Sequence, residues 1–193
     1  MRRSRPNTVR IIGGRWRSRI VEFADVAGVR PTPDRVRETL FNWLGQTLAG
    51  LDCLDLFAGS GVLGFEAASR GARSVVMVEK HPRVLASLRA SARLLDAANV
   101  RLAHGDALEF LRAPGVRYDV VFVDPPYRLA LVDQALALLP PVLAPEARVY
   151  VESDAPFHAG PGWSMIRHAR AGQVHYHLLG RDPDDQGRLP RNV

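Results

Sequence analysis

The spacing of hydrophobic residues changes near residue 50. Before it, one helical pattern runs from Val36 to Leu48 and stops at Gly50. Beyond it, apolar runs of strand length alternate with helical patterns, which predicts βαβ units, a parallel sheet and right-handed crossovers. The strand-like runs are 51–57, 74–79, 100–104, 118–123, 147–152 and 174–179, and the helical patterns occupy about 62–70, 82–96, 106–112 and 130–139.

The last strand-like segments, around 163–168 and 173–179, are joined by a tight turn with no helix between them. Strands joined this closely pair in the antiparallel direction. We therefore expect an α/β fold whose doubly wound, mostly parallel sheet of seven strands carries an antiparallel edge strand.

Two short strand-like segments, 8–12 and 15–21, lie near the start of the chain on either side of a Gly-Gly pair. This arrangement predicts a β-hairpin with a two-residue glycine turn. A helix is expected after it, with Thr32 as the N-cap and Pro33 as the first helical residue.

The composition is that of a soluble protein, with 193 residues of which 47% are hydrophobic and 24% charged. Its apolar stretches are too short for a transmembrane helix, and its basic start lacks the apolar region of a secretory signal. A single cysteine excludes an internal disulfide. We expect a cytoplasmic monomer, without membrane contact, in which an extension over residues 1–49 packs on a main domain over residues 50–193.

The positive charge is concentrated at the start of the chain. The net charge is +6, yet residues 1–37 alone hold ten arginines against three acids. Such segregation indicates a surface that binds a polyanion, and nucleic acid is the favoured partner. Arg35 and Arg37 have an alternative role as ion-pair partners of Asp34 or Glu38 on their own helix. The candidate phosphate-binding residues are Arg10, Arg15, Arg17, Arg19, Arg30, Arg35 and Arg37.

The most informative motif is the turn Asp124-Pro125-Pro126-Tyr127, which ends a buried strand. Proline has no N–H, so the Pro125 carbonyl is available to a ligand at the edge of the sheet where ligands bind. Asp124 and that carbonyl can accept the two hydrogens of a planar amino group while Tyr127 stacks on the ring. The alternative is an ordinary turn at the end of a strand.

A glycine-rich turn follows the first strand of the main domain. Gly59, Gly61 and Gly64 have the spacing of a dinucleotide fingerprint, which fits NAD as well as other adenosine cofactors. Glu79 ends the next strand and can accept hydrogen bonds from ribose hydroxyls. Asp55 favours a cationic amino group and would repel a pyrophosphate.

Two weaker candidates complete the set. Asp106 and Ala107 follow the third strand and can meet the edge of an adenine, although Asp106 has an alternative role as a helix cap. His175 and His177 form a close histidine pair, but no cysteine or acid pattern accompanies them, so no metal site is expected.

Taken together, D-x-F-x-G-x-G, a strand-ending acid, G-D-A and D-P-P-Y resemble class I S-adenosylmethionine-dependent N-methyltransferases. More narrowly, V-R-I-I-G-G-R-W-R, R-P-T-P-D-R-V-R-E, D-L-F-A-G-S-G-V-L-G-F-E-A and V-F-V-D-P-P-Y resemble the RsmD family. The resemblance covers about residues 8–180. Pro33 and Phe65 depart from the family pattern, where threonine and leucine are expected.

The resemblance implies a Rossmann-like class I methyltransferase fold and methylation of guanine N2 in 16S ribosomal RNA, within an assembling small-subunit particle. S-adenosylmethionine would be the cofactor, without a metal. It implies that Asp124, Pro125 and Tyr127 are catalytic and that the cofactor is bound by Asp55, Phe57, Gly59, Gly61, Glu79, Lys80, Asp106, Ala107 and Thr32.

Other functions share some of these features. N6-adenine and glutamine-amide methyltransferases use the same D-P-P-Y clamp, because each substrate presents a planar NH2 group. A Rossmann oxidoreductase and a non-catalytic RNA-binding protein are alternatives from other classes. The basic segment at the start of the chain favours RNA as the substrate.

Overall fold

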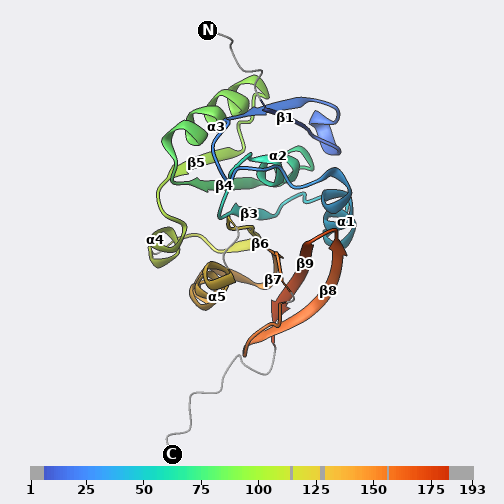
Figure 1. Cartoon of the computed structure of the whole chain (residues 1–193), viewed down its shortest axis with the longest axis vertical. Helices are drawn as coiled ribbons and strands as arrows, with labels where there is room; N and C mark the ends of the chain where they lie inside the picture. The colour runs from blue at the N-terminus through green and yellow to red at the C-terminus, as the bar shows by residue number, and fades with distance from the viewer. Residues whose placement is uncertain (1–6, 114, 127–128, 156, 183–193) are drawn as a thin grey trace, which may run out of the picture.

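The computed structural model describes residues 7–113, 115–126, 129–155 and 157–182. A seven-stranded sheet lies at its centre (Figure 1). The strands are β3 (Asp52–Asp55), β4 (Ser74–Glu79), β5 (Val100–His104), β6 (Tyr118–Val123), β7 (Leu143–Ser153), β8 (Trp163–Ala171) and β9 (Val174–Arg181). Their order is β5-β4-β3-β6-β7-β9-β8, and β3 to β7 run parallel.

This arrangement confirms the predicted fold class of a mostly parallel, Rossmann-like sheet. The structure adds one detail at the C-terminal edge. The strand that pairs antiparallel with its neighbours is β9, and it lies between β7 and the edge strand β8. The short β8–β9 connection makes these two strands antiparallel neighbours, and the pairing of β9 with β7 leaves β8 at the edge.

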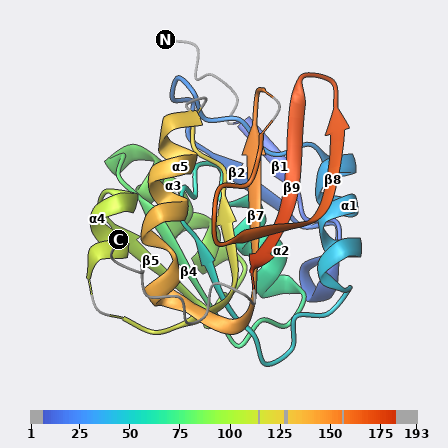
Figure 2. The ribbon, with the colours of Figure 1, turned by 90° about the horizontal axis from the view of Figure 1, so that it is seen from below.

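Helices cover both faces of the sheet, which explains why its parallel strands are almost continuously apolar. Figure 2 shows α4 and α5 on one side and α1 on the other. Alternate strand residues enter two separate cores, so Cys53 packs with α1, α2 and α3 while Leu54 packs with α4 and α5. The helices are α1 (Asp34–Leu44), α2 (Val62–Ser69), α3 (Pro82–Leu94), α4 (Ala107–Arg112) and α5 (Leu129–Leu138), with a 3-10 turn η2 (Pro140–Val142).

The predicted N-terminal hairpin is present, but its turn differs from the prediction. Strands β1 (Asn7–Arg10) and β2 (Ile20–Phe23) pair antiparallel, and the chain between them includes the 3-10 turn η1 (Gly14–Trp16). Trp16 is buried, and its N–H donates to Ser69 Oγ on α2 at 2.9 Å. The longer connection lets Trp16 reach α2, and local sequence patterns do not predict such a long-range contact.

Helix α1 is shorter than predicted at both ends. It begins at Asp34, with Pro33 as the N-cap residue, and ends at Leu44 because Gly45 has a φ of 95°. The prediction of Thr32 as N-cap is wrong. Its hydroxyl donates to Asp124 Oδ2 at 3.5 Å instead, so Thr32 lies at the carboxyl ends of the strands.

A buried cluster of charges joins the extension to the main domain. Glu66 on α2 is fully buried and pairs with both Arg37 and Arg70, at 3.2 and 2.9 Å. The same carboxylate accepts the Ile12 N–H at 2.9 Å, and Arg37 Nε donates to the Thr32 carbonyl at 3.0 Å. One carboxylate thus anchors the hairpin, α1 and the segment leading to Thr32.

The prediction that Arg37 contacts phosphates is therefore wrong, since its side chain has no exposed surface. It also pairs with Asp34, which is the alternative that the sequence left open. Within the part of the chain that the structure describes, no helix is long and apolar enough to cross a membrane.

Candidate functional site

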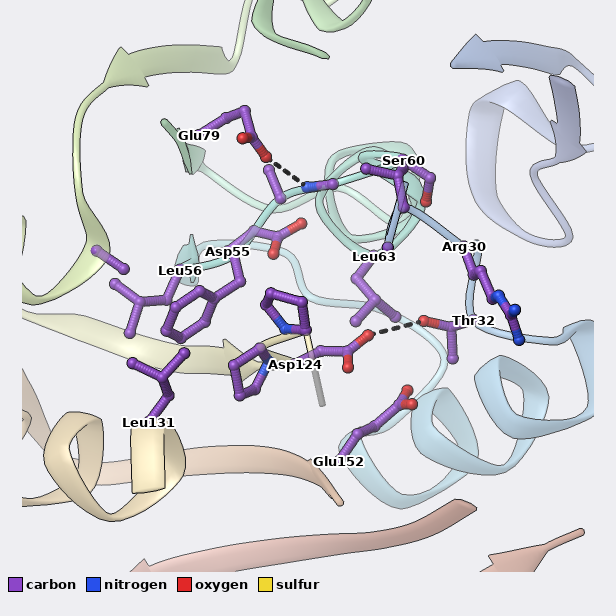
Figure 3. A pocket seen from close by; sticks show the side chains of 18 of the residues that line it. Arg30, Thr32, Asp55, Leu56, Ser60, Leu63, Glu79, Asp124, Leu131 and Glu152 are labelled. Carbon is purple, nitrogen blue, oxygen red and sulfur yellow. Dashed lines mark hydrogen bonds between the residues drawn. The ribbon is translucent and has the colours of Figure 1, made fainter. Parts of the chain in front are cut away.

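A cavity of about 450 Å³ lies at the carboxyl ends of the parallel strands (Figure 3). Its walls come from the ends of β3, β4, β6 and β7, from the segment 105–108 after β5, and from the loop 26–33 of the extension. The chain order of the strands reverses between β3 and β6, which is where doubly wound sheets bind ligands. The volume suits a small molecule.

The structure brings most of the predicted site residues to this cavity. Gly61 does not line it, and Tyr127 lies outside the described residues. The predicted residues in its wall are Arg30, Thr32, Asp55, Phe57, Gly59, Glu79, Lys80, Asp106, Ala107, Asp124 and Pro125.

Glu79 holds the glycine-rich turn in place. Its Oε2 accepts the Gly59 N–H at 3.0 Å and its Oε1 accepts the His81 N–H at 2.7 Å, so it links that turn to the start of α3. Gly59 has a φ of 50°. Gly61 serves packing: a Cβ there would lie 2.4 Å from Leu88 Cδ2 in the core. The turn therefore presents Gly59 to the cavity and Gly61 to the interior.

Asp55 is a buried carboxyl at the end of β3, and its Oδ2 accepts the Gly64 N–H at 3.0 Å. Burial raises the pKa of Asp55 from 3.8 to about 7, the Gly64 N–H opposes the rise, and the charge of Glu79 adds to it. A cationic ligand in the cavity would favour the ionised form. Asp55 is thus suited to hold an ammonium group.

The raised pKa of Asp55 predicts a pH-dependent stability. The folded protein keeps this proton above pH 3.8 whereas the unfolded chain releases it, so ionisation destabilises the fold progressively up to about pH 7. Asp55→Asn retains an oxygen for the Gly64 N–H and carries no charge. The free energy of unfolding of this variant, relative to that of the parent protein, should rise by about 2–3 kcal/mol from pH 5 to pH 8. Urea denaturation at both pH values measures the gain, and an unchanged difference would contradict it.

Asp124 lies half-buried at the end of β6, with the buried Pro125 after it. Burial raises its pKa well above the ordinary value, and the charges of Glu152 and Asp55 raise it further, while the Thr32 hydroxyl lowers it. Its carboxylate points into the cavity beside Thr32 (Figure 3). The arrangement offers an oxygen acceptor of unusual basicity to any donor that enters.

Glu152 is a cavity residue that the sequence analysis missed. It ends the apolar part of β7, and the Tyr150 hydroxyl donates to its Oε1 at 2.7 Å. Burial raises its pKa, against the effect of the Tyr150 and Thr32 hydroxyls. The signal was present, because an acid at the end of a parallel strand is the feature that had identified Glu79.

Asp106 adopts the alternative role that the sequence left open, although it also lines the cavity. Its Oδ1 accepts the N–H groups of Leu108 at 2.9 Å and Glu109 at 3.4 Å, which caps α4. The cap fixes the segment 105–108 as one wall of the cavity. The apolar side chain of Leu131, from α5, lies on the same side (Figure 3).

Apart from the buried Arg37, the arginines of the extension that the structure describes form two groups, one on the hairpin and one made of Arg30 and Arg35. Arg15 and Arg19 donate to the carbonyls of Asp96 and Leu94, at the C-terminal end of α3. The N-terminal end of the same helix, at His81, lines the cavity. The helix has 13 residues, so this group lies about 20 Å from the cavity. The exposed side chains are those of Arg10, Arg15, Arg17 and Arg19 on the hairpin, Arg30 at the cavity and Arg35 on α1.

The histidines of β8 and β9 stack on one another. His168 lies 4.7 Å from His177 and 5.8 Å from His175, measured between ring centroids, and burial lowers the pKa of His177 to about 4. Among the described residues, no group of three or more histidine, cysteine or acidic side chains is placed to hold a metal ion.

Comparisons with known proteins agree on one family. Residues 9–180 match the family described as conserved hypothetical protein 95. The chain is 44% identical to ribosomal RNA small subunit methyltransferase D of Escherichia coli K12, over 90% of each chain. It is 40% identical to the Haemophilus influenzae protein of the same name, over 88% of this chain and 92% of that one. The solved structure of putative methyltransferase yhhF from Escherichia coli superposes with a TM-score of 0.83 at 43% identity, covering 91% of this chain and 99% of that one.

Proposed function

The chain belongs to the family described as conserved hypothetical protein 95, the family that its motifs predicted, and on that basis we propose that it is a ribosomal RNA methyltransferase. We further propose that it transfers the methyl group of S-adenosylmethionine to N2 of a guanine in 16S ribosomal RNA. The observation that carries this proposal is that Asp124 and Pro125 face the same cavity as Asp55 and Glu79. The proposed clamp for an amino group would therefore lie beside a site that suits an adenosine cofactor.

The cavity residues fit S-adenosylmethionine. The buried carboxyl of Asp55 suits the amino group of its methionine part, and Glu79, which already accepts two N–H groups, has acceptor capacity left for ribose hydroxyls. Phe57 and Leu131 supply apolar surface for the adenine, next to the segment 105–108. When bound, the cofactor supplies a methyl group on a reactive sulfonium.

Asp124 and the Pro125 carbonyl would hold the target amine. Their oxygens accept the two N2 hydrogens, which orients the nitrogen lone pair and stabilises the positive charge that develops on N2. The Thr32 hydroxyl fixes the orientation of the Asp124 carboxylate. The raised pKa of Asp124 also makes it a stronger proton acceptor than a solvated aspartate. The chain thus contributes positioning and electrostatics to the reaction.

The target guanine must leave its stack to reach this cavity, so we propose an unpaired nucleotide as the substrate. Arg30 at the cavity and Arg35 on α1 would meet phosphates close to that nucleotide. The hairpin arginines would meet phosphates about 20 Å away, near the end of α3. The RNA would then cross the face that joins the cavity to the hairpin, and we propose that a monomer binds it within an assembling small-subunit particle.

Mapping of methylated nucleotides tests the proposed reaction. Small-subunit RNA from a strain that lacks the protein is incubated with it and with labelled S-adenosylmethionine, and the product is located by mass spectrometry. Label in N2-methylguanine is expected. Label in N6-methyladenine or in a protein glutamine would replace the proposal with one of the alternative amine substrates.

Charge reversal on the hairpin is expected to weaken RNA binding without changing catalysis at saturating RNA. The double variant Arg15→Glu/Arg17→Glu should make the negative slope of log affinity against log salt shallower by about 1–2. Both side chains are exposed and remote from the cavity. A matched control reverses Arg101 and Arg112, which are exposed on β5 and α4. Filter binding at several salt concentrations measures the slope, and equal slopes for both variants would show that the hairpin has another task.

A further inference from the structure

The clamp formed by Asp124 and Pro125 does not distinguish one base from another. Adenine, cytosine and guanine all present a planar NH2 group, and two oxygen acceptors hold each of them equally well. The bases differ at the ring nitrogen that adjoins that group on the Watson–Crick edge. In guanine this nitrogen is N1–H, a donor, whereas in adenine and cytosine it carries a lone pair. A residue that selects guanine must therefore be an acceptor placed next to the clamp.

Glu152 occupies such a place. It lines the cavity from the end of β7, the strand next to the one that carries Asp124. Figure 3 shows its carboxylate pointing toward Asp124 and Thr32. The two carboxylates are close enough for the charge of Glu152 to raise the pKa of Asp124. The mechanism proposed above leaves Glu152 without a task, although it is an acid in the wall of the cavity.

The Tyr150 hydroxyl holds Glu152 in place, and the carboxyl, which also interacts with the Thr32 hydroxyl, keeps acceptor capacity for a ligand. Its Oε1 accepts the Tyr150 hydroxyl at 2.7 Å, and Tyr150 is itself buried in the core, where it cannot readily move. Two carboxylates that face one another repel, so the pair favours a ligand that brings hydrogen-bond donors to both. The Watson–Crick edge of guanine supplies N1–H and the N2 amino group side by side.

We propose that Glu152 selects guanine by accepting a hydrogen bond from N1–H while Asp124 and the Pro125 carbonyl hold the N2 amino group. This inference rests on the proposed function and makes it specific for one base. A base with a lone pair at the corresponding nitrogen places this acceptor opposite the Glu152 carboxylate, which is also an acceptor. Rejection then arises because a buried acceptor remains unpaired, which is an effective source of specificity.

The test replaces the methylated guanosine in a synthetic RNA fragment with 2-aminopurine, which keeps the amino group and lacks the N1–H. The parent protein should prefer guanine by about 10²-fold or more in kcat/KM. In Glu152→Gln the new amide offers both an acceptor and a donor, so the preference should fall to about tenfold or less. A second analogue, 2,6-diaminopurine, restores a substituent at C6 and should follow 2-aminopurine.

Asp154→Asn is the matched control, because Asp154 also lines the cavity but is exposed. Its preference for guanine should equal that of the parent protein. A role of Glu152 in folding alone would lower the rates on both bases together and leave their ratio unchanged, which would overturn the inference.

Two further outcomes keep the inference separate from the proposed function. If the parent protein methylates 2-aminopurine as well as guanine, N1–H is not recognised and the inference fails, whether or not the variant folds. If the parent protein methylates neither base at an amino group, the proposed function itself fails.

Discussion

Asp124→Ala is expected to lower the rate of methyl transfer by about 10²–10³-fold and to leave the affinity for S-adenosylmethionine nearly unchanged. The carboxylate would hold the target amine and stabilise the charge that develops on it, so its contribution is larger in the transition state than in the bound substrate. The proposed cofactor contacts lie elsewhere in the cavity, at Asp55 and Glu79. The loss should therefore appear in kcat and not in cofactor binding.

Single-turnover methylation and calorimetric titration of the cofactor measure the two effects separately. Asp124→Asn keeps an acceptor oxygen without the charge, and we expect its rate to lie between those of the parent and the alanine variant. Asp154→Ala removes an exposed acid from the same cavity and serves as the control. Full activity of Asp124→Ala would exclude the clamp.

Glu66→Ala is expected to lower the free energy of unfolding by about 3–5 kcal/mol. The substitution leaves Arg37 and Arg70 buried with their main partner removed, and the Ile12 N–H loses its acceptor. A domain of ordinary stability has about 5–15 kcal/mol in total, so this loss is a large share of it. Guanidinium denaturation followed by circular dichroism measures the change.

The control for this prediction is an ion pair on the surface. Glu109→Ala removes the partner of Arg112, and both side chains are more than half exposed, so the loss should stay below about 1 kcal/mol. Combined replacement of Arg37, Glu66 and Arg70 by apolar residues of similar size should recover much of the stability. A loss for Glu66→Ala no larger than that of the control would show that the buried cluster is not needed for the fold.

The parallel strands and most of the cavity were predictable because both follow from local pattern. Each parallel strand is closed by a polar residue, and parallel strands bring these ends to one edge of the sheet. Asp55, Glu79 and Asp124 therefore meet although they are far apart in the sequence. Glu152 also lies at the end of a parallel strand, so the sequence contains the information that was needed to predict it.

The features that escaped prediction depend on distant contacts. The connection of the hairpin is long because Trp16 reaches Ser69, which lies 53 residues further along the chain. Arg37 is buried because Glu66 lies on a neighbouring helix, whereas its sequence neighbours suggested an exposed basic helix. Charge is visible in a sequence, but burial of a charge is decided by the partner that folding brings to it.

The loop 26–33 limits how the protein can be truncated or recombined with its relatives. Because this loop walls the cavity and Arg37 ties Thr32 to α2, the proposed RNA recognition and the proposed chemistry depend on the same stretch of chain. A fragment that begins at residue 50 would lose this wall of the cavity together with core residues that the hairpin and α1 supply, among them Ile11, Val36 and Phe41. Chimeras that exchange RNA targets between relatives should therefore place the junction before residue 24, so that the recipient keeps its own loop and α1.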